Sequence, residues 1–167
     1  EASGISCRLA TVADAASYAR AAERFFRATY SHDPHHAAIM DAHCAETYAV
    51  AVIEDQLRDP LTKVILAEAS GEIVGLAPLH QAYDARIELV RFYLDVGWQG
   101  RGLAATLLDE ARRVARAVGA RTMHLGVWTD NHRAIAFYNR QGFVATGEVP
   151  FLLAGVAQAE LLMEKDL

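Results

Sequence analysis

The chain has 167 residues, 53% of them hydrophobic, and a formal net charge of −5, a composition typical of a folded protein rather than of a disordered segment. No apolar run approaches the roughly 18 residues that a membrane span needs, and the negative charge disfavours a nucleic-acid partner. The first ten residues lack the apolar block of a secretory signal, so we expect a cytoplasmic protein with free thiols at Cys7 and Cys44. The length predicts a single domain over residues 1–167.

Hydrophobic periodicity predicts a short strand and three helices in the first third of the chain. Thr11 is expected to cap the first helix, with Asp14 at its third position. Pro60 is expected to stop the chain from continuing the third helix. In chain order, the strand and the three helices are expected over residues 5–9, 13–30, 35–43 and 45–58.

The rest of the chain is expected to alternate between strands and helices. The expected elements are strands over 63–68, 72–81 and 86–94, a helix over 103–118, a strand over 121–128, a helix over 131–141, and strands over 143–150 and 158–164. Hairpins followed by helix crossovers imply a mixed sheet with helices on its faces. The predicted fold class is therefore α/β (α+β), with a mixed central sheet of about seven strands.

A glycine loop joins the strand over 86–94 to the helix over 103–118. Its sequence, Gln99-Gly100-Arg101-Gly102-Leu103-Ala104, lacks both the GxGxxG and the GxxxxGK[ST] pattern, which removes the main support for dinucleotide or nucleoside-triphosphate binding. Free N–H groups and the positive end of the dipole at a helix start favour an anion such as a phosphate. We interpret the loop as a pyrophosphate site; a tight strand–helix turn without a ligand is the alternative.

A second motif lies at the start of the helix over 131–141. It reads Asn131-x-x-Ala134-x-x-Phe137-Tyr138-x-x-x-Gly142-Phe143. Helical geometry places Asn131, Ala134 and Tyr138 on one face. Together with Gln99-x-x-Gly102-x-Ala104, this motif resembles the GCN5-related N-acetyltransferase (GNAT) superfamily, and the order of predicted elements agrees with that fold over nearly the whole chain.

Two further segments resemble one bacterial subgroup of that superfamily, the spermidine/spermine acetyltransferases. They are Glu88–Tyr93 (ELVRFY) and Leu125–Trp128 (LGVW). Near the C-terminal end, Val149 and Glu160 stand where that subgroup usually has a His and an Asp.

The resemblance implies acetyl-CoA as the donor and a site for it along the strand, the loop and the second motif. The end of the strand, Phe92–Leu94, would splay from its neighbour and pair with the pantetheine arm, and the loop would hold the pyrophosphate. The residues expected to bind the cofactor are Phe92, Tyr93, Leu94, Gln99, Gly100, Arg101, Gly102, Leu103, Ala104, Asn131 and Tyr138.

Three residues are expected to take part in the chemistry. The N–H of Leu94 would polarise the thioester carbonyl. Tyr138 would protonate the departing CoA thiolate as a general acid, unless it is a core aromatic. Because an alkyl amine has a pKa near 10, a base is also needed, and Glu88 is the candidate. A solvated carboxylate or a partner for Arg91 is an equally good interpretation of Glu88.

The expected acceptor is the primary amine of a small molecule, such as a polyamine or another cationic amine. The acidic residues that could attract it are Asp33, Asp41, Glu46 and Asp84. A peptide, protein or amino-acid amine is an alternative, and a non-catalytic acetyl-CoA sensor is a second one. The histidines between positions 32 and 43 fit no familiar ligand spacing, so no metal is expected. Dimers are common in the superfamily, which leaves a homodimer open.

Overall fold

A single curved sheet runs through the molecule, and the computed structural model describes it over residues 4–30, 37–153 and 155–167. Its strands lie in the order β1-β2-β3-β4-β6-β8-β7, and β5 pairs with β3 beside β4. Their bounds are β1 Ser6–Leu9, β2 Thr62–Ala69, β3 Glu72–Gln81, β4 Arg86–Leu89, β5 Tyr93–Leu94, β6 Thr122–Trp128, β7 Val144–Leu153 and β8 Val156–Asp166. β4 and β6 run parallel, and the other paired strands run antiparallel, so the sheet is mixed, as predicted.

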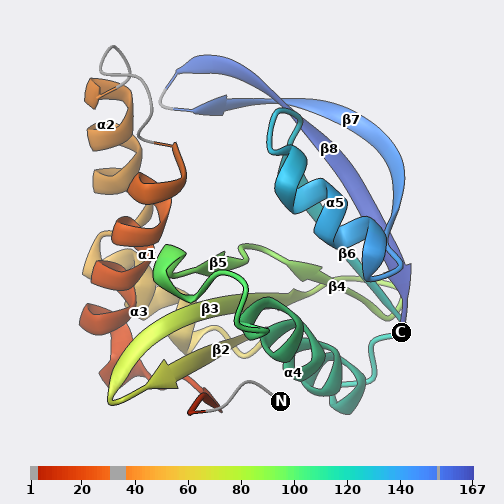
Figure 1. Cartoon of the computed structure of the whole chain (residues 1–167), viewed down its shortest axis with the longest axis horizontal. Coiled ribbons are helices and arrows are strands. Elements are labelled where there is room, and N and C mark those ends of the chain that lie inside the picture. The colour runs from red at the N-terminus through yellow and green to blue at the C-terminus, as the bar shows by residue number, and fades with distance from the viewer. Residues whose placement is uncertain (1–3, 31–36, 154) are drawn as a thin grey trace.

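Helices cover both faces of the sheet (Figure 1). Their bounds are α1 Ala15–Tyr30, α2 Ala37–Thr47, α3 Val50–Arg58, α4 Leu103–Ala117 and α5 His132–Arg140. The first three helices share one core with Val64, Leu66 and Leu76. α4 and α5 share the other core with Ile65 and Ile87. Because side chains alternate across a strand, the two cores lie on opposite faces.

The helix boundaries near residue 45 differ from the prediction. The sequence indicated a break at residue 44, whereas α2 continues to Thr47 and α3 begins at Val50. Tyr48 lies between them, buried, and its hydroxyl lies 3.0 Å from the hydroxyl of Tyr93. This contact at the break joins residues 45 positions apart, and local periodicity does not reveal such a contact.

The strand predicted over 86–94 is interrupted. Leu89 pairs with Leu79, and Tyr93 pairs with Leu76. The segment from Leu89 to Tyr93 is therefore one residue longer than the segment of β3 that it faces. The extra residue makes a β-bulge opposite Pro78. The carbonyl of Pro78 accepts a hydrogen bond from the N–H of Val90, but proline has no N–H with which to donate the second bond of the pair. The prediction of one continuous strand was therefore wrong.

The bulge reverses which face each side chain occupies. Leu89 belongs to the core of α4 and α5, and strict alternation would send Arg91 and Tyr93 to that same face. Instead Phe92 and Leu94 pack against that core, and Tyr93 packs in the core of α1–α3.

The two halves of the sheet separate beyond a short ladder. β4 and β6 pair only from Arg86 with Thr122 to Glu88 with His124, within the part of the chain that the structure describes. Beyond it, β5 and the end of β6 have different partners, since β5 pairs with β3 and β6 with β8. The sheet therefore opens at the end where the glycine loop begins.

We expect Asp14→Asn to lower the free energy of unfolding by about 1 kcal/mol at neutral pH, the usual size of a helix cap. The Asp14 carboxylate accepts bonds from Arg8 at 2.8 and 2.9 Å and from the N–H of Thr11 at 2.7 Å. The bonds from Arg8, with that from Thr11, lower its pKa to about 2. Since this pKa lies below that of an unfolded Asp, the stabilisation is present above about pH 4 and is lost as the pH falls towards 2.

Urea unfolding of both proteins at a series of pH values measures this difference. Asp109→Asn is the matched control, because the Asp109 side chain is 70% exposed beside Arg112 and its loss is expected to cost little. A destabilisation by Asp14→Asn that stays constant down to pH 2 would contradict the assignment.

In the described part of the chain, no helix combines the length and the apolar character needed to cross a membrane.

Candidate active site

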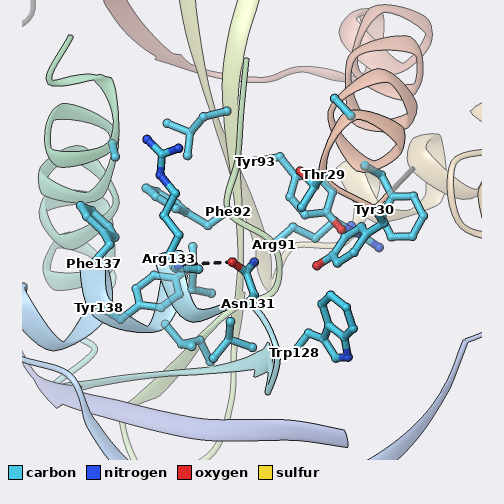
Figure 2. Close-up of a pocket in the computed structure, with 18 of the residues that line it drawn as sticks. Thr29, Tyr30, Arg91, Phe92, Tyr93, Trp128, Asn131, Arg133, Phe137 and Tyr138 are labelled. Atoms are coloured by element: carbon cyan, nitrogen blue, oxygen red, sulfur yellow. Dashed lines mark hydrogen bonds between the residues drawn. The ribbon is translucent and has the colours of Figure 1, made fainter. Parts of the chain in front are cut away.

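A cavity of about 960 Å³ lies where the two halves of the sheet separate. Residues of α1, the β4–β5 segment, the glycine loop, β6, α5 and the β7–β8 hairpin line it. In Figure 2, Tyr30, Arg91 and Tyr93 lie on the side of α1, and Phe137 and Tyr138 lie on the side of α5. Each of the two hydrophobic cores of the fold therefore contributes residues to one wall of the cavity.

The glycine loop lines one end of this cavity. Gly100 and Gly102 have φ angles of 77° and 78°, a conformation that glycine adopts without steric cost. The first bond within α4 runs from the N–H of Thr106 to the carbonyl of Gly102. The N–H groups of Leu103, Ala104 and Ala105 precede that bond, so they have no partner within the helix.

Arg101 and Gln99 have other contacts. The N–H of Arg101 donates to the carbonyl of Trp98 at 3.3 Å, its guanidinium lies over the Trp98 ring, and it does not line the cavity. The other loop residues expected to bind the cofactor do line the cavity. The Gln99 side chain accepts a bond of 2.6 Å from Arg133, which ties the loop to α5.

The N–H of Leu94 points away from β3. The N–H of Asp95 donates to Val74, so Asp95 and Val74 form a hydrogen-bonded pair of the antiparallel ladder. Hydrogen-bonded and open pairs alternate, and the neighbouring pair, Leu94 with Gly75, is therefore open. Leu94 lines the cavity, so its free N–H lies on the side where the sheet has separated.

Tyr138 lies on α5, and Asn131 caps the start of this helix. Asn131 precedes the helix, and its side chain accepts a bond of 3.2 Å from the N–H of Ala134 (Figure 2). Tyr138 is 6% exposed, and its ring packs between those of Phe92, Phe137 and Phe143.

The Tyr138 hydroxyl forms no hydrogen bond with a described residue, although Tyr138 lines the cavity. Burial raises the pKa of this phenol above its usual value, so it is protonated at neutral pH. A phenol in this state can donate a proton.

The structure places Glu88 outside the large cavity. It lines a smaller neighbouring cavity of about 250 Å³, opposite His124 on β6. Glu160 on β8 lines both cavities. Burial, and then the neighbouring charge of Glu88, raise the pKa of Glu160.

A glycine makes room for the Glu160 carboxylate. A Cβ added to Gly126 would lie 2.7 Å from Oε2 of Glu160, so the carboxylate rests directly on the β6 backbone. Glycine inside a strand often marks such a close approach, and this was the signal in the sequence that could have indicated Glu160.

Of the four acidic residues expected to attract a cationic amine, the three that the structure describes do not line the cavity. Asp41 forms an ion pair with Arg27 at 2.8 Å, and neither Glu46 nor Asp84 lines the cavity. Asp33 and three of the histidines, at positions 32, 35 and 36, lie outside the described residues. Among the described residues, no group of three or more His, Cys, Asp or Glu side chains is arranged to hold a metal ion.

Comparisons with known proteins give the family. The model of the acetyltransferase (GNAT) family matches residues 19–143. An uncharacterised N-acetyltransferase of Mycobacterium tuberculosis is 33% identical over 133 residues, which is 80% of this chain and 83% of that protein. The spermine/spermidine N(1)-acetyltransferase of Bacillus subtilis is more distant, at 28% identity over 81% of this chain and 94% of that protein. The predicted nearness to the spermidine/spermine subgroup is therefore not the strongest likeness.

Solved structures show the same fold. The PaiA N-acetyltransferase of Thermoplasma acidophilum, determined in complex with coenzyme A, has a TM-score of 0.81 at 20% identity, covering 98% of this chain and 99% of that one. A GCN5-related N-acetyltransferase of Rhodopseudomonas palustris has a TM-score of 0.77 at 23% identity, covering 100% of this chain and 98% of that one. The chain belongs to the acetyltransferase (GNAT) family and is an acetyl-CoA-dependent N-acetyltransferase.

Proposed function

We propose that this enzyme transfers the acetyl group of acetyl-CoA directly to the primary amine of a small molecule. The observation that carries the proposal is that one cavity is lined by Leu94, with its free N–H, by the Tyr138 phenol and by the loop at the start of α4. An oxyanion donor, a general acid and a phosphate site are the three groups that this reaction needs on the donor side.

The donor would lie along the separated strands. The loop and the first N–H groups of α4 would hold the pyrophosphate, and the pantetheine arm would run beside β5 like an added strand. The Leu94 N–H would then face the thioester carbonyl. A single oxyanion donor of this kind contributes on the order of 3 kcal/mol to the stabilisation of the transition state.

The acceptor amine would approach from the side of α1. Glu160 would take a proton from the ammonium, directly or through water, and the free amine would attack the thioester carbon. As the tetrahedral intermediate collapses, the carbon–sulfur bond breaks and Tyr138 protonates the CoA thiolate. The second proton of the attacking nitrogen passes to the Tyr138 phenolate, directly or through water, which restores the phenol and leaves a neutral amide. Glu88, which was the candidate base, would then act through its charge on Glu160.

A thiol-release assay tests the proposal. Acetyl-CoA is supplied with polyamines, amino acids, simple alkylamines and short peptides, and free CoA is measured together with the acetylated product. The N(1)-acetyltransferase relative makes polyamines one candidate class. Binding of acetyl-CoA without turnover of any amine would favour the alternative of a non-catalytic sensor.

Gly126→Ala is expected to lower kcat/KM by about tenfold or more, because the new methyl group would displace the Glu160 carboxylate by about an ångström. Gly147→Ala in β7 is the matched control, since a Cβ there meets no atom within 4 Å. Steady-state kinetics and a thermal melt of both variants separate the loss of activity from a loss of stability. Equal activity in the two variants would remove the argument that the position of Glu160 matters.

A further inference from the structure

We propose that the acceptor is a small amine that also carries a carboxylate, and that Arg91 binds this carboxylate. The inference rests on the proposed acetyl transfer and names the substrate class of the same cavity. The position of Arg91, its contacts and the charges of the cavity wall support it.

The bulge after β4 places Arg91 on the acceptor side. Because alternation reverses there, Arg91 extends towards α1 rather than towards α4, and its Nη1 lies 3.2 Å from the hydroxyl of Tyr18 on α1. Its guanidinium also lies over the Tyr48 ring, at 5.5 Å from the ring centroid. Arg91 lines the large cavity, on the same side as Tyr30 and Tyr93 (Figure 2).

Within the described part of the chain, Arg91 has no carboxylate partner. Among these residues, its one side-chain hydrogen bond goes to Tyr18, and the groups that raise the pKa of its guanidinium are Tyr18, Tyr48 and Tyr93. Burial raises the pKa of each of these phenols, that of Tyr48 to about 12, so they are neutral. A half-buried cation held only by neutral groups is incompletely compensated.

The remaining donors of Arg91 are accessible, and Arg91 lines the cavity. Arg112 Nε and His124 Nδ1 are the buried side-chain nitrogens without a partner in the described structure, and no Arg91 nitrogen is among them. The Arg91 nitrogens that do not bond Tyr18 are therefore not sealed inside the protein. A guanidinium with free donors on a cavity wall matches the two oxygens of a carboxylate.

The charges of the cavity wall disfavour a polyamine. Glu160 is the only carboxylate among the described lining residues, whereas Arg91, Arg133 and Arg140 are cations. A polyamine has two or more ammonium groups to compensate, and one of them would face Arg91. An amine with one carboxylate matches this wall instead, with its ammonium at Glu160 and its anion at Arg91.

Acceptors of matched size test the proposal on the enzyme with saturating acetyl-CoA. One series compares δ-aminovalerate with pentylamine and cadaverine, which share a five-carbon chain. The other compares L-alanine with L-alaninamide, and tri-alanine distinguishes a free amino acid from a peptide. We expect kcat/KM for at least one carboxylate acceptor to exceed that of its neutral or cationic counterpart on the order of ten- to a hundredfold.

Substitution of Arg91 tests the assignment of the residue. Arg91→Met keeps an unbranched side chain without the charge, and it is expected to lower the ratio of kcat/KM for the carboxylate acceptor to that for its neutral counterpart to about one. Arg91→Lys keeps the charge without the two-pronged geometry, so it should retain part of the preference. Arg20→Met, at an exposed position of α1 whose side chain hydrogen-bonds Ser17, is the matched control and should behave as the wild type.

The outcomes separate the two proposals. If the wild type turns over the neutral or cationic counterparts as well as or better than the carboxylate acceptors in both series, the carboxylate acceptor is overturned and acetyl transfer to amines is left intact. A preference that survives in folded Arg91→Met overturns the role of Arg91. Turnover of no amine, with acetyl-CoA bound, overturns the proposed function itself. If Arg91→Met fails to fold, the wild-type ratios and Arg91→Lys still decide.

Discussion

Tyr138→Phe is expected to lower kcat by about 10²- to 10⁴-fold and to leave KM for acetyl-CoA nearly unchanged, because the variant loses a proton donor and keeps the ring. The ring packs among Phe92, Phe137 and Phe143, and these contacts do not involve the hydroxyl. The hydroxyl bonds no described residue, so its removal leaves no protein group unsatisfied. Stability should therefore change little while the chemical step slows.

Single-turnover and steady-state measurements with saturating donor check this result. Acetyl thioesters of thiols with lower pKa values provide a second readout. A better leaving group needs less protonation, so such donors should recover part of the rate that Tyr138→Phe loses. Tyr83→Phe is the matched control, because Tyr83 lies on an exposed turn and its side chain is 92% exposed. Unchanged kcat in Tyr138→Phe would assign this tyrosine to packing alone.

Glu160→Gln is expected to lower kcat/KM by about 10²-fold or more and to remove the acidic limb of the pH–rate profile. A base acts when deprotonated, so the wild-type rate should fall as the pH drops through the pKa of Glu160. Burial and the charge of Glu88 raise that pKa, which moves the limb to a higher pH than for an ordinary glutamate. The amide cannot titrate, and the limb should disappear with it.

Glu88→Gln distinguishes the two candidate bases in the same experiment. If Glu160 is the base, removal of the Glu88 charge lowers the pKa of Glu160, so the acidic limb shifts to lower pH while the plateau stays close to the wild type. If Glu88 is the base, this variant loses the limb, and Glu160→Gln retains it. The two carboxylates line the same small cavity, so each variant serves as the control for the other.

The local elements of the fold were predictable, and the contacts between distant elements were not. The periodicity of Leu103, Leu107 and Ala111 marks α4 without reference to the rest of the chain, and all three are buried in one core. The glycine loop and the Asn131–Phe143 motif were likewise visible, because a tight turn and a helix cap are encoded over a few neighbouring residues. The structure places both beside one cavity.

The bulge and the position of Glu160 depend on other strands. Strand periodicity over 86–94 cannot reveal that Pro78, on the paired strand, lacks the N–H that would continue the ladder. The place of Glu160 follows from the pairing of β8 with β6 and from the absence of a side chain at Gly126. Both are facts of register between segments far apart in sequence, and a single sequence contains no measure of register.

The bulge also bears on how enzymes with this strand can diverge. After it, Leu94 has its main-chain N–H on the side that we propose for the donor, whereas the side chains of Arg91 and Tyr93 extend towards α1, where we propose that the acceptor binds. Every residue type except proline offers the same N–H, so evolution can vary the side chains of this short segment without losing the donor contact. With the roles proposed above, one strand combines a constant main-chain contact to the thioester with variable side chains at the acceptor, so single substitutions in it can yield new substrates.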